Sequence, residues 1–523
     1  MDAPILLTGT TLTPELVRSI ARDGAEVRVA DEAVARIAAA NQVVLQAVRS
    51  GTPVYGVTTG LGSRVTESVA DGGAEFSLRT IRGRATAVGE PLGVELTRAT
   101  MTVRLNGICA GGSGASPAVA QLLAGMLNEG VHPVIPRSGS VGAADLCLMA
   151  HVGLAMIGEG EAEFSGVRMG SARALSAAGL LALSPGPKDG LAICSANSVS
   201  AGTAALALAE ARALLDCAQI SAALSMEGFR AALTPLDPRV VQARPQPGQE
   251  WSAAGLRALL AGGSLTESGA SRRLQDPLSF RCASQLHGSL HAALELLAAA
   301  LEPELNGAAD NPLVLTADHE IVSTGNFHVP ALALALDAAA IGIAQVASAI
   351  AERQSRLKVT RLSGLPRSLV RPDDSDPTRT GLAALTKTAE SLMLEIRHRA
   401  APVAIHSVVS GDGVEDDCTG AAQGALRLTE QLTRLQLLIA TELIVAAQAT
   451  ELAAPERLGA GTAEAQRCVR EVVPTVTEDR ALGPDVERIA RAVVTGDALR
   501  SRVRAATAAA AAPAAAAGAE IHA

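Results

Sequence analysis

The stretch from Arg137 to Gly160 reads Arg-Ser-Gly-Ser-Val-Gly-Ala-Ala-Asp-Leu-Cys-Leu-Met-Ala-His-Val-Gly-Leu-Ala-Met-Ile-Gly-Glu-Gly. Small residues fill positions 139–144, and they let a backbone turn tightly and approach another group closely. Asp145 stands where a helix N-cap belongs, and the apolar run from Leu146 to Ile157 predicts a buried helix that ends at Gly158. We therefore expect a tight loop that feeds a helix N-terminus, where free backbone N–H groups face whatever binds.

The composition describes a large, acidic chain with an aliphatic core. Its 523 residues include one Trp, one Tyr and five Phe, and the formal net charge is −9. With no basic stripe in the sequence, this charge argues against nucleic-acid binding. The seven cysteines form no CxxC pair, which is typical of reduced thiols in a cytoplasmic protein. The dispersed histidines predict no metal site, and we expect no signal peptide.

Alanine- and leucine-rich segments dominate the second part of the chain. We expect long helices over about 200–224, 283–302, 329–357, 377–400 and 420–453. They predict a bundle and not membrane spans, because the most apolar stretches carry Asp337 and Glu442. The fold class is therefore mostly α.

Two segments are expected to lack regular structure. Residues 239–273, rich in Pro, Gly and Ser, predict a mobile connection, and the alanine-rich tail over 505–523 is expected to be disordered. Two domains are then predicted: an N-terminal domain over 1–190, and a central bundle with C-terminal helices over 191–504.

The loop at 139–146 closely resembles the signature of the aromatic amino acid ammonia-lyase and aminomutase family, which includes histidine, phenylalanine and tyrosine lyases. The family loop reads Gly-Ser-Val-Gly-Ala-Ser-Gly-Asp-Leu, and its Ala-Ser-Gly cyclises into the electrophile methylidene-imidazolone (MIO). Here the loop is one residue shorter and lacks the serine that supplies the methylene. The degenerate MIO loop consists of Gly142, Ala143, Ala144 and Asp145. It is not expected to form MIO, and no other cofactor is predicted.

The resemblance recurs over roughly residues 10–490, and it implies a long-helix bundle of the ammonia-lyase (fumarase/aspartase-like) type with a smaller N-terminal active-site domain. Val54-Tyr-Gly-Val-Thr-Thr-Gly60 looks like the family's loop with the catalytic tyrosine, so Tyr55 is the expected acid or base. Gln275-Asp-Pro-Leu-Ser-Phe-Arg-Cys282 is similar to Gln-Asp-x-Tyr-Ser-x-Arg-Cys. This implies that Arg281 binds the substrate carboxylate beside Gln275, whereas Leu278 replaces the family's second tyrosine.

Gly325-Asn-Phe-His328 resembles a family loop that lines the pocket, which implies that Asn326 and Phe327 contact the substrate. His328 by itself is more typical of a structural histidine. The segment Glu304–Pro312 is similar to a loop whose asparagines order the cofactor region, and Asn311 is its expected functional residue.

Four further positions depart from the family pattern or leave two interpretations open. Glu415 aligns with a family glutamate near the substrate amine, and a solvated loop residue is the alternative. Ser195 replaces the asparagine that supports MIO, with Asn197 close by. Arg84 stands where the family selects the aromatic ring, so it suits a polar or anionic substrate group unless it belongs to a solvated basic helix.

Tyr55 and Arg281 are retained. The electrophile, the second tyrosine and the asparagine that supports MIO are missing. Without MIO, ammonia loss from an ordinary aromatic amino acid would need purely electrostatic stabilisation by the protein. The first hypothesis is therefore an MIO-independent elimination, addition or isomerisation of a small carboxylate substrate that has a good leaving group or an acidified proton.

Two alternatives remain: a conventional ammonia-lyase or aminomutase with an unusual electrophile, and a catalytically inactive scaffold homologue. The resemblance also implies a cytoplasmic homotetramer whose active sites combine residues of three subunits. We expect neither nucleic acid nor a membrane as a partner.

Overall fold

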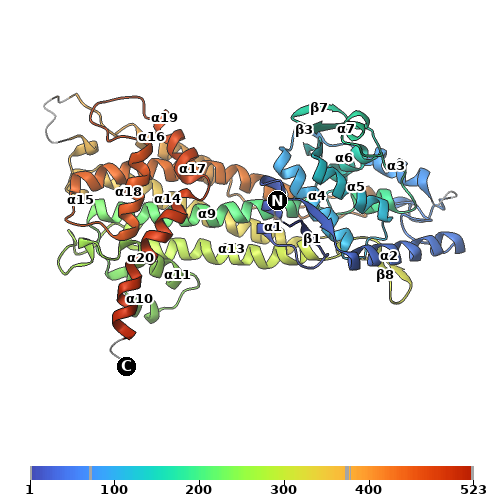
Figure 1. Cartoon of the computed structure of the whole chain (residues 1–523), viewed down its shortest axis with the longest axis horizontal. Helices are drawn as coiled ribbons and strands as arrows, with labels where there is room; N and C mark the ends of the chain where they lie inside the picture. The colour runs from blue at the N-terminus through green and yellow to red at the C-terminus, as the bar shows by residue number, and fades with distance from the viewer. Residues whose placement is uncertain (1–2, 70–72, 372–375, 377, 520–523) are drawn as a thin grey trace. The chain divides into compact units, whose positions relative to one another are not determined.

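The computed structural model describes residues 3–69, 73–371, 376 and 378–519. The chain forms two compact units that interleave along the sequence (Figure 1). Unit 1 comprises Met1–Ala209, Leu296–Asp337 and Pro402–Thr429, and unit 2 comprises Glu210–Glu295, Ala338–Ala401 and Glu430–Ala523. These units divide the chain at positions other than the predicted boundary at residue 190. Four long helices have residues in both units, namely α9 (Ser198–Phe229), α13 (Ala283–Asn306), α14 (Pro330–Leu357) and α17 (Ala421–Ala453).

Unit 1 combines short helices with small sheets. Its further helices are α1 (Pro14–Arg22), α2 (Asp31–Ser50), α3 (Ala74–Arg84), α4 (Val94–Cys109), α5 (Pro117–Glu129), α6 (Leu146–Met156), α7 (Ser171–Ala177) and α8 (Asp189–Cys194). The parallel pair is β1 (Ile5–Leu7) with β2 (Val27–Val29). The antiparallel pairs are β3 (Val88–Pro91) with β5 (Pro136–Ser138), β4 (Val131–Pro133) with β6 (Glu161–Phe164), β6 with β7 (Val167–Gly170), and β8 (Leu313–Leu315) with β9 (Glu320–Val322). The predicted helix after the glycine-rich loop is α6. The helices α3, α7 and α8 pack against it.

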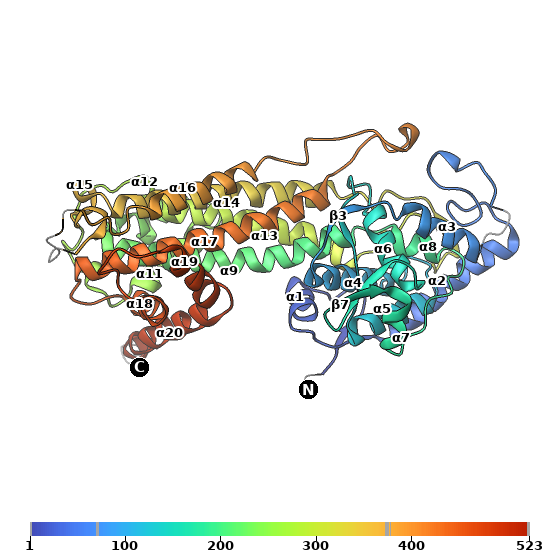
Figure 2. The ribbon, with the colours of Figure 1, turned by 90° about the horizontal axis from the view of Figure 1, so that it is seen from above.

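Unit 2 is almost entirely helical. Besides its parts of the long helices it contains α10 (Pro238–Ala243), α11 (Gln249–Leu260), α12 (Leu278–Arg281), α15 (Thr360–Ser363), α16 (Leu385–His398), α18 (Ala460–Val472), α19 (Gly483–Ile489) and α20 (Ala498–Ala519). Here α9, α13, α14 and α17 run side by side in both views (Figures 1 and 2). The mostly α fold class is confirmed.

The bundle in unit 2 contains a buried ion pair. Arg353 of α14 contacts Glu442 of α17 at 2.7 Å (Nε to Oε1), and both side chains are fully buried. Ser221 and Ser225 of α9 donate further hydrogen bonds to the Glu442 carboxylate, at 2.7 and 3.0 Å. Because each charge is paired and hydrogen-bonded, the core holds it without an unpaired ion.

Among the residues that the structure describes, three helices are long and apolar enough to cross a membrane by length and composition: Asp189–Phe229, Pro330–Leu357 and Ala421–Ala453. Their most apolar windows are 100%, 67% and 78% buried within the structure. Burial of this extent follows from packing in the predicted bundle, where apolar surface faces other helices.

The structure corrects two expectations about irregular segments and one about the start of a helix. Residues 239–273 contain most of α10 and all of α11, and are not a connection without structure. The tail is helical to Ala519 as part of α20, and 520–523 lie outside the described residues. The helix expected over 377–400 begins only at Leu385, and its first position lies outside the described residues.

Candidate active site

Tyr55 lies on a compact loop that follows α2 in unit 1. Val54 and Val57 anchor this loop in a buried cluster with Val43 and Val44 of α2. The half-buried Tyr55 side chain turns back along its own loop, and its hydroxyl accepts a 2.9 Å hydrogen bond from the backbone N–H of Gly62. The apolar anchors therefore fix the loop while the phenol stays accessible.

The degenerate MIO loop is held in a strained turn. Gly142 has φ +92°, and a Cβ there would lie 2.4 Å from both the Gly420 backbone N and Thr419 Oγ1, so only glycine fits. Ala144 adopts φ +58°, a left-handed conformation that costs a residue with a Cβ about 1 kcal/mol or more. The hydroxyl of Ser140, a buried neighbour, donates to Ala144 O at 3.2 Å and to Asp145 Oδ1 at 2.9 Å.

Asp145 does not cap α6, which corrects the sequence prediction. Its carboxylate makes no capping hydrogen bond in its own helix and instead accepts from Ser200 N at 2.8 Å, in the first turn of α9. Ser200 Oγ donates to the same carboxylate at 3.0 Å. Burial raises the pKa of the Asp145 carboxyl, and the hydrogen bonds from Ser200 and Ser140 oppose this shift. The loop is thereby attached to the start of α9, where the helix dipole favours an anion.

The segment between Pro402 and Thr429 links the two loops. At one end, Ser63 Oγ near Tyr55 donates to Asp412 Oδ2 at 2.8 Å. At the other end, Thr419 Oγ1 donates to Gly142 O at 2.9 Å and Gly420 N donates to Val141 O at 3.1 Å. Figure 2 shows this segment before α17 extending towards the loop that follows α2. The Tyr55 loop and the degenerate MIO loop are therefore held by one segment of the chain.

Glu415 lies on this same segment. Its carboxylate is half-buried and accepts from Ser410 Oγ at 2.6 Å, across a short bridge between the two residues. The structure thus gives Glu415 a defined position on the segment that joins the two loops.

Phe327 and His328 bring a third loop to the degenerate MIO loop. Ala143 and His328 form a backbone bridge, so Phe327, which is half-buried, is adjacent to the strained turn. Asn326 is more exposed and donates to Ala308 O at 3.3 Å. Asn311 holds this loop, because its Oδ1 accepts from Thr324 N at 2.9 Å.

A contact between His328 and Asp417 was not predicted. His328 Nε2 lies 3.1 Å from Asp417 Oδ2, and this hydrogen bond lowers the pKa of the Asp417 carboxyl. The two residues are 89 positions apart, so only the fold brings them together. They place an acid–base pair next to Ala143.

Ser195 and Asn197 are both buried, in the turn between α8 and α9. Nearby, burial raises the pKa of the Glu304 carboxyl to about 7, against the opposing effect of the Asn197 amide. This site therefore includes a carboxyl group that changes its protonation state near neutral pH.

Arg84 ends α3 and its side chain is half-buried. Its positive charge lowers the pKa of the Cys194 thiol, although burial dominates and raises that pKa to about 12. The guanidinium therefore lies towards α8 and Ser195. Arg82, by contrast, points to solvent and pairs with Glu159 at 2.6 Å. Within the described part of the chain, Arg84 makes no ion pair.

Arg281 and Gln275 form a second group, in unit 2. With the Gln275 amide oxygen turned towards it, Arg281 donates to that oxygen through Nη1 and through Nη2 at 3.2 Å. Its Nε atom is buried without a partner among the described residues. Phe280, 2% exposed, stacks on Phe229 with ring centroids 4.2 Å apart and anchors this short helix. Leu278, where the family has a tyrosine, is 61% exposed.

Each group by itself offers side chains with a defined chemistry. The group in unit 1 contains a phenol, carboxyl groups and the guanidinium of Arg84. The group in unit 2 contains a planar guanidinium, a shape suited to a carboxylate. Within the described residues, no group of three or more His, Cys, Asp or Glu residues is arranged to hold a metal ion.

Comparison with known proteins identifies the chain as a member of the aromatic amino acid lyase family, whose profile matches residues 12–471. A histidine ammonia-lyase of Treponema denticola is 36% identical over 486 residues, which cover 92% of this chain and 95% of that protein. A histidine ammonia-lyase of Symbiobacterium thermophilum is 37% identical, with 94% and 96% covered. The chain is therefore a carbon–nitrogen lyase by family.

Solved structures agree with this assignment. Histidine ammonia-lyase of Trypanosoma cruzi superposes with a TM-score of 0.88 at 31% identity, covering 96% of this chain and 95% of that one. The ergothioneine-degrading enzyme ergothionase of Treponema denticola, in complex with desmethyl-ergothioneine sulfonic acid, has a TM-score of 0.89 at 29% identity, with 96% and 99% covered. The ammonia-lyase type of bundle is thus confirmed.

Proposed function

We propose that this protein eliminates a tertiary amine from an amino-acid betaine without MIO, and that its substrate is ergothioneine or a close analogue. The observation that carries the proposal is the degenerate MIO loop, in which Ala143-Ala144 leaves no serine to supply the methylene. The residues present do not fit the family's electrophile, so no step is assigned to it. The similarity to an ergothioneine-degrading enzyme supports a substrate of this kind.

The leaving group explains why an electrophile is dispensable. An α-ammonium group leaves poorly, whereas the α-nitrogen of a betaine carries three methyl groups and a fixed positive charge. In the proposed reaction Tyr55, as phenolate, takes the β-proton. The electrons of that C–H bond form the Cα–Cβ double bond, and the Cα–N bond breaks to release neutral trimethylamine. Charges balance, and the product is an unsaturated carboxylate.

The remaining residues bind and orient the substrate. Arg281, supported by Gln275, holds the carboxylate, and Phe327 packs against the ring. The guanidinium of Arg84 suits the sulfur on the ring of ergothioneine, which carries partial negative charge. Glu415 and the pair of His328 and Asp417 supply further charge beside the loop. We further propose a cytoplasmic homotetramer, in which Tyr55 and Arg281 of one site come from different subunits.

The first experiment is the intact mass of the purified protein with peptide mapping across Pro136–His151, followed by amine assays. We expect an unmodified mass and trimethylamine release from ergothioneine, with Tyr55→Phe reducing the rate at least about 100-fold. Arg84→Met is expected to slow ergothioneine more than histidine betaine, which lacks the sulfur. A mass short by two waters at residues 142–145 would overturn the proposal.

A conventional histidine ammonia-lyase is the second candidate, because the relatives of that name are 36–37% identical over nearly the whole chain. This candidate requires an electrophile in the loop and ammonia release from L-histidine. The same mass measurement and an ammonia assay therefore decide between the two.

A further inference from the structure

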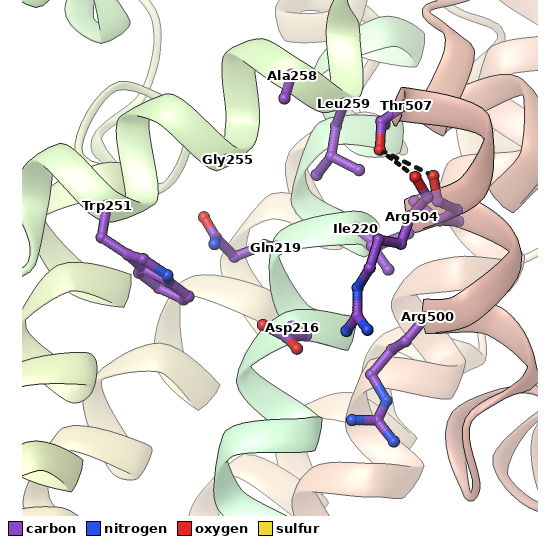
Figure 3. A pocket seen from close by; sticks show the side chains of 11 residues that line it. Asp216, Gln219, Ile220, Trp251, Gly255, Ala258, Leu259, Arg500, Arg504 and Thr507 are labelled. Atoms are coloured by element: carbon purple, nitrogen blue, oxygen red, sulfur yellow. Dashed lines mark hydrogen bonds between the residues drawn. The ribbon is translucent and has the colours of Figure 1, made fainter. Parts of the chain in front are cut away.

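A pocket in unit 2 uses none of the residues assigned to the reaction. It lies between α9, α11 and α20 and has a volume of about 250 Å³ (Figure 3). An apolar cavity of roughly 150 Å³ holds one benzene molecule, so this volume suits a ligand of about ten non-hydrogen atoms. The pocket is thus the size of a single amino acid with a ring.

One wall of the pocket is aromatic. Trp251 of α11 is the only tryptophan in the chain, and its side chain is oriented into the pocket (Figure 3). The indole packs on His291, with ring centroids 4.3 Å apart, which fixes its orientation. It is 37% exposed, so one part of the indole remains free to pack against a planar ligand.

Two arginines and a carboxylate face the same space. Arg504 and Arg500 of α20 lie near Asp216 of α9, and both guanidinium groups lower the pKa of that carboxyl, although burial raises it overall. Asp216 forms no ion pair or hydrogen bond with another residue in the described part of the chain. Arg500 pairs with Asp497 at 3.0 Å, but its Nε is buried without a partner among the described residues. Arg504 and Asp216 therefore both line the cavity without an ion pair among the described residues, and Arg500 keeps one unpaired donor.

Gln219 adds a directed donor. Its side chain is 5% exposed, and its Oε1 accepts from Ser252 Oγ at 2.8 Å. This bond fixes the amide so that Nε2 faces the pocket, where the described residues offer it no acceptor. A buried amide with one satisfied end and one open end marks a place for a ligand acceptor.

We propose that this pocket binds a zwitterionic amino acid with a planar ring, at a site separate from the catalytic one. The ligand carboxylate pairs with Arg504 and Arg500, its ammonium group with Asp216, and its ring packs on Trp251 while a ring nitrogen accepts from Gln219. Each of the three helices contributes to this binding, so an occupied pocket joins α20 to α9 and α11.

Intrinsic fluorescence tests this directly, because every tryptophan photon comes from Trp251. We would titrate the full-length protein with L-histidine, with 3-(imidazol-4-yl)propanoate, which lacks the ammonium group, and with histamine, which lacks the carboxylate. We expect a saturable emission change with L-histidine, and affinities at least about tenfold weaker for the two analogues.

Variants separate this site from the catalytic one. Arg504→Ala and Asp216→Asn are each expected to weaken L-histidine binding at least about tenfold. Arg491→Ala, which removes an exposed arginine outside the pocket, and Tyr55→Phe should both leave it unchanged. The proposal is overturned if emission does not respond, if histamine binds as tightly as L-histidine, or if Arg504→Ala binds normally. Far-ultraviolet circular dichroism checks that each variant is folded. The outcome is independent of whether the catalytic proposal holds.

Discussion

Breaking the buried ion pair of unit 2 should destabilise it strongly. Glu442→Gln keeps the shape of the side chain but only one of the two oxygens to which Ser221 and Ser225 donate. It also leaves the fully buried Arg353 guanidinium without a counter-charge. Removing one partner of such a pair costs about 3–5 kcal/mol. Because the glutamine oxygen still accepts from one of the two serines, we expect the free energy of unfolding to fall by about 3 kcal/mol, at the lower end of this range.

Urea unfolding followed by Trp251 emission measures this effect, since Trp251 and the ion pair belong to the same unit. With a slope of about 3 kcal/mol/M, a loss of about 3 kcal/mol lowers the midpoint by about 1 M. The matched control is Glu487→Gln, which breaks an exposed ion pair with Arg491 and should cost less than about 1 kcal/mol.

A double variant provides the decisive comparison. Arg353→Met with Glu442→Leu removes both charges, and apolar replacement of a buried pair is often neutral or stabilising. We therefore expect the double variant to be at least about 2 kcal/mol more stable than Glu442→Gln. If the single and double variants unfold at the same urea concentration, an unpaired buried charge is not the cause of the loss.

Three further outcomes follow from the pKa shifts and the carboxylate site. Burial and the Arg353 guanidinium lower the pKa of His287 to about 3, so the unfolded chain takes up the proton first as pH falls below about 6.5. The free energy of unfolding of unit 2 should therefore fall by about 2 kcal/mol by pH 5. Urea titrations should show that His287→Leu removes this decrease. Burial raises the pKa of the Glu304 carboxyl to about 7. The contribution of the protonated carboxyl to stability is therefore fully present below a pH of about 4.5 and is lost as the pH rises through 7. Glu304→Gln should therefore raise stability at pH 8 by up to about 3 kcal/mol, measured by circular dichroism, and an unchanged pH profile would contradict this. Arg281→Lys should raise KM at least about tenfold with a smaller effect on kcat, because an ammonium group cannot bind a carboxylate in two places.

Much of the fold follows from apolar periodicity in the sequence. The helices expected over 283–302, 329–357 and 420–453 correspond closely to α13, α14 and α17, because long apolar stripes leave few alternatives to a bundle. The sequence does not predict the short helices α10 and α11, because Pro, Gly and Ser are typical of loops. Pro238 instead occupies the first turn of α10, where its missing N–H costs no hydrogen bond.

The site was only partly predictable for a different reason. Motifs of consecutive residues indicated Tyr55 and Arg281, because their neighbours form recognisable patterns. The partner of Asp145 is Ser200, 55 positions away, and local sequence suggested the adjacent helix instead. No sequence pattern relates His328 to its partner Asp417, or places Trp251 and Arg504 on one pocket, since both arrangements depend on tertiary packing.

The attachment of the degenerate MIO loop to α9 limits how the loop can change. To build Ala-Ser-Gly into this loop, a residue would have to be inserted between Gly142 and Asp145. Gly142 has no room for a side chain, and Asp145 caps the 32-residue helix α9 through Ser200. An added residue that pulled Asp145 away from Ser200 would leave a buried carboxylate and the helix end unsatisfied together. Converting one chemistry into the other is therefore a matter of rebuilding the start of a structural helix, and a serine substitution alone does not achieve it.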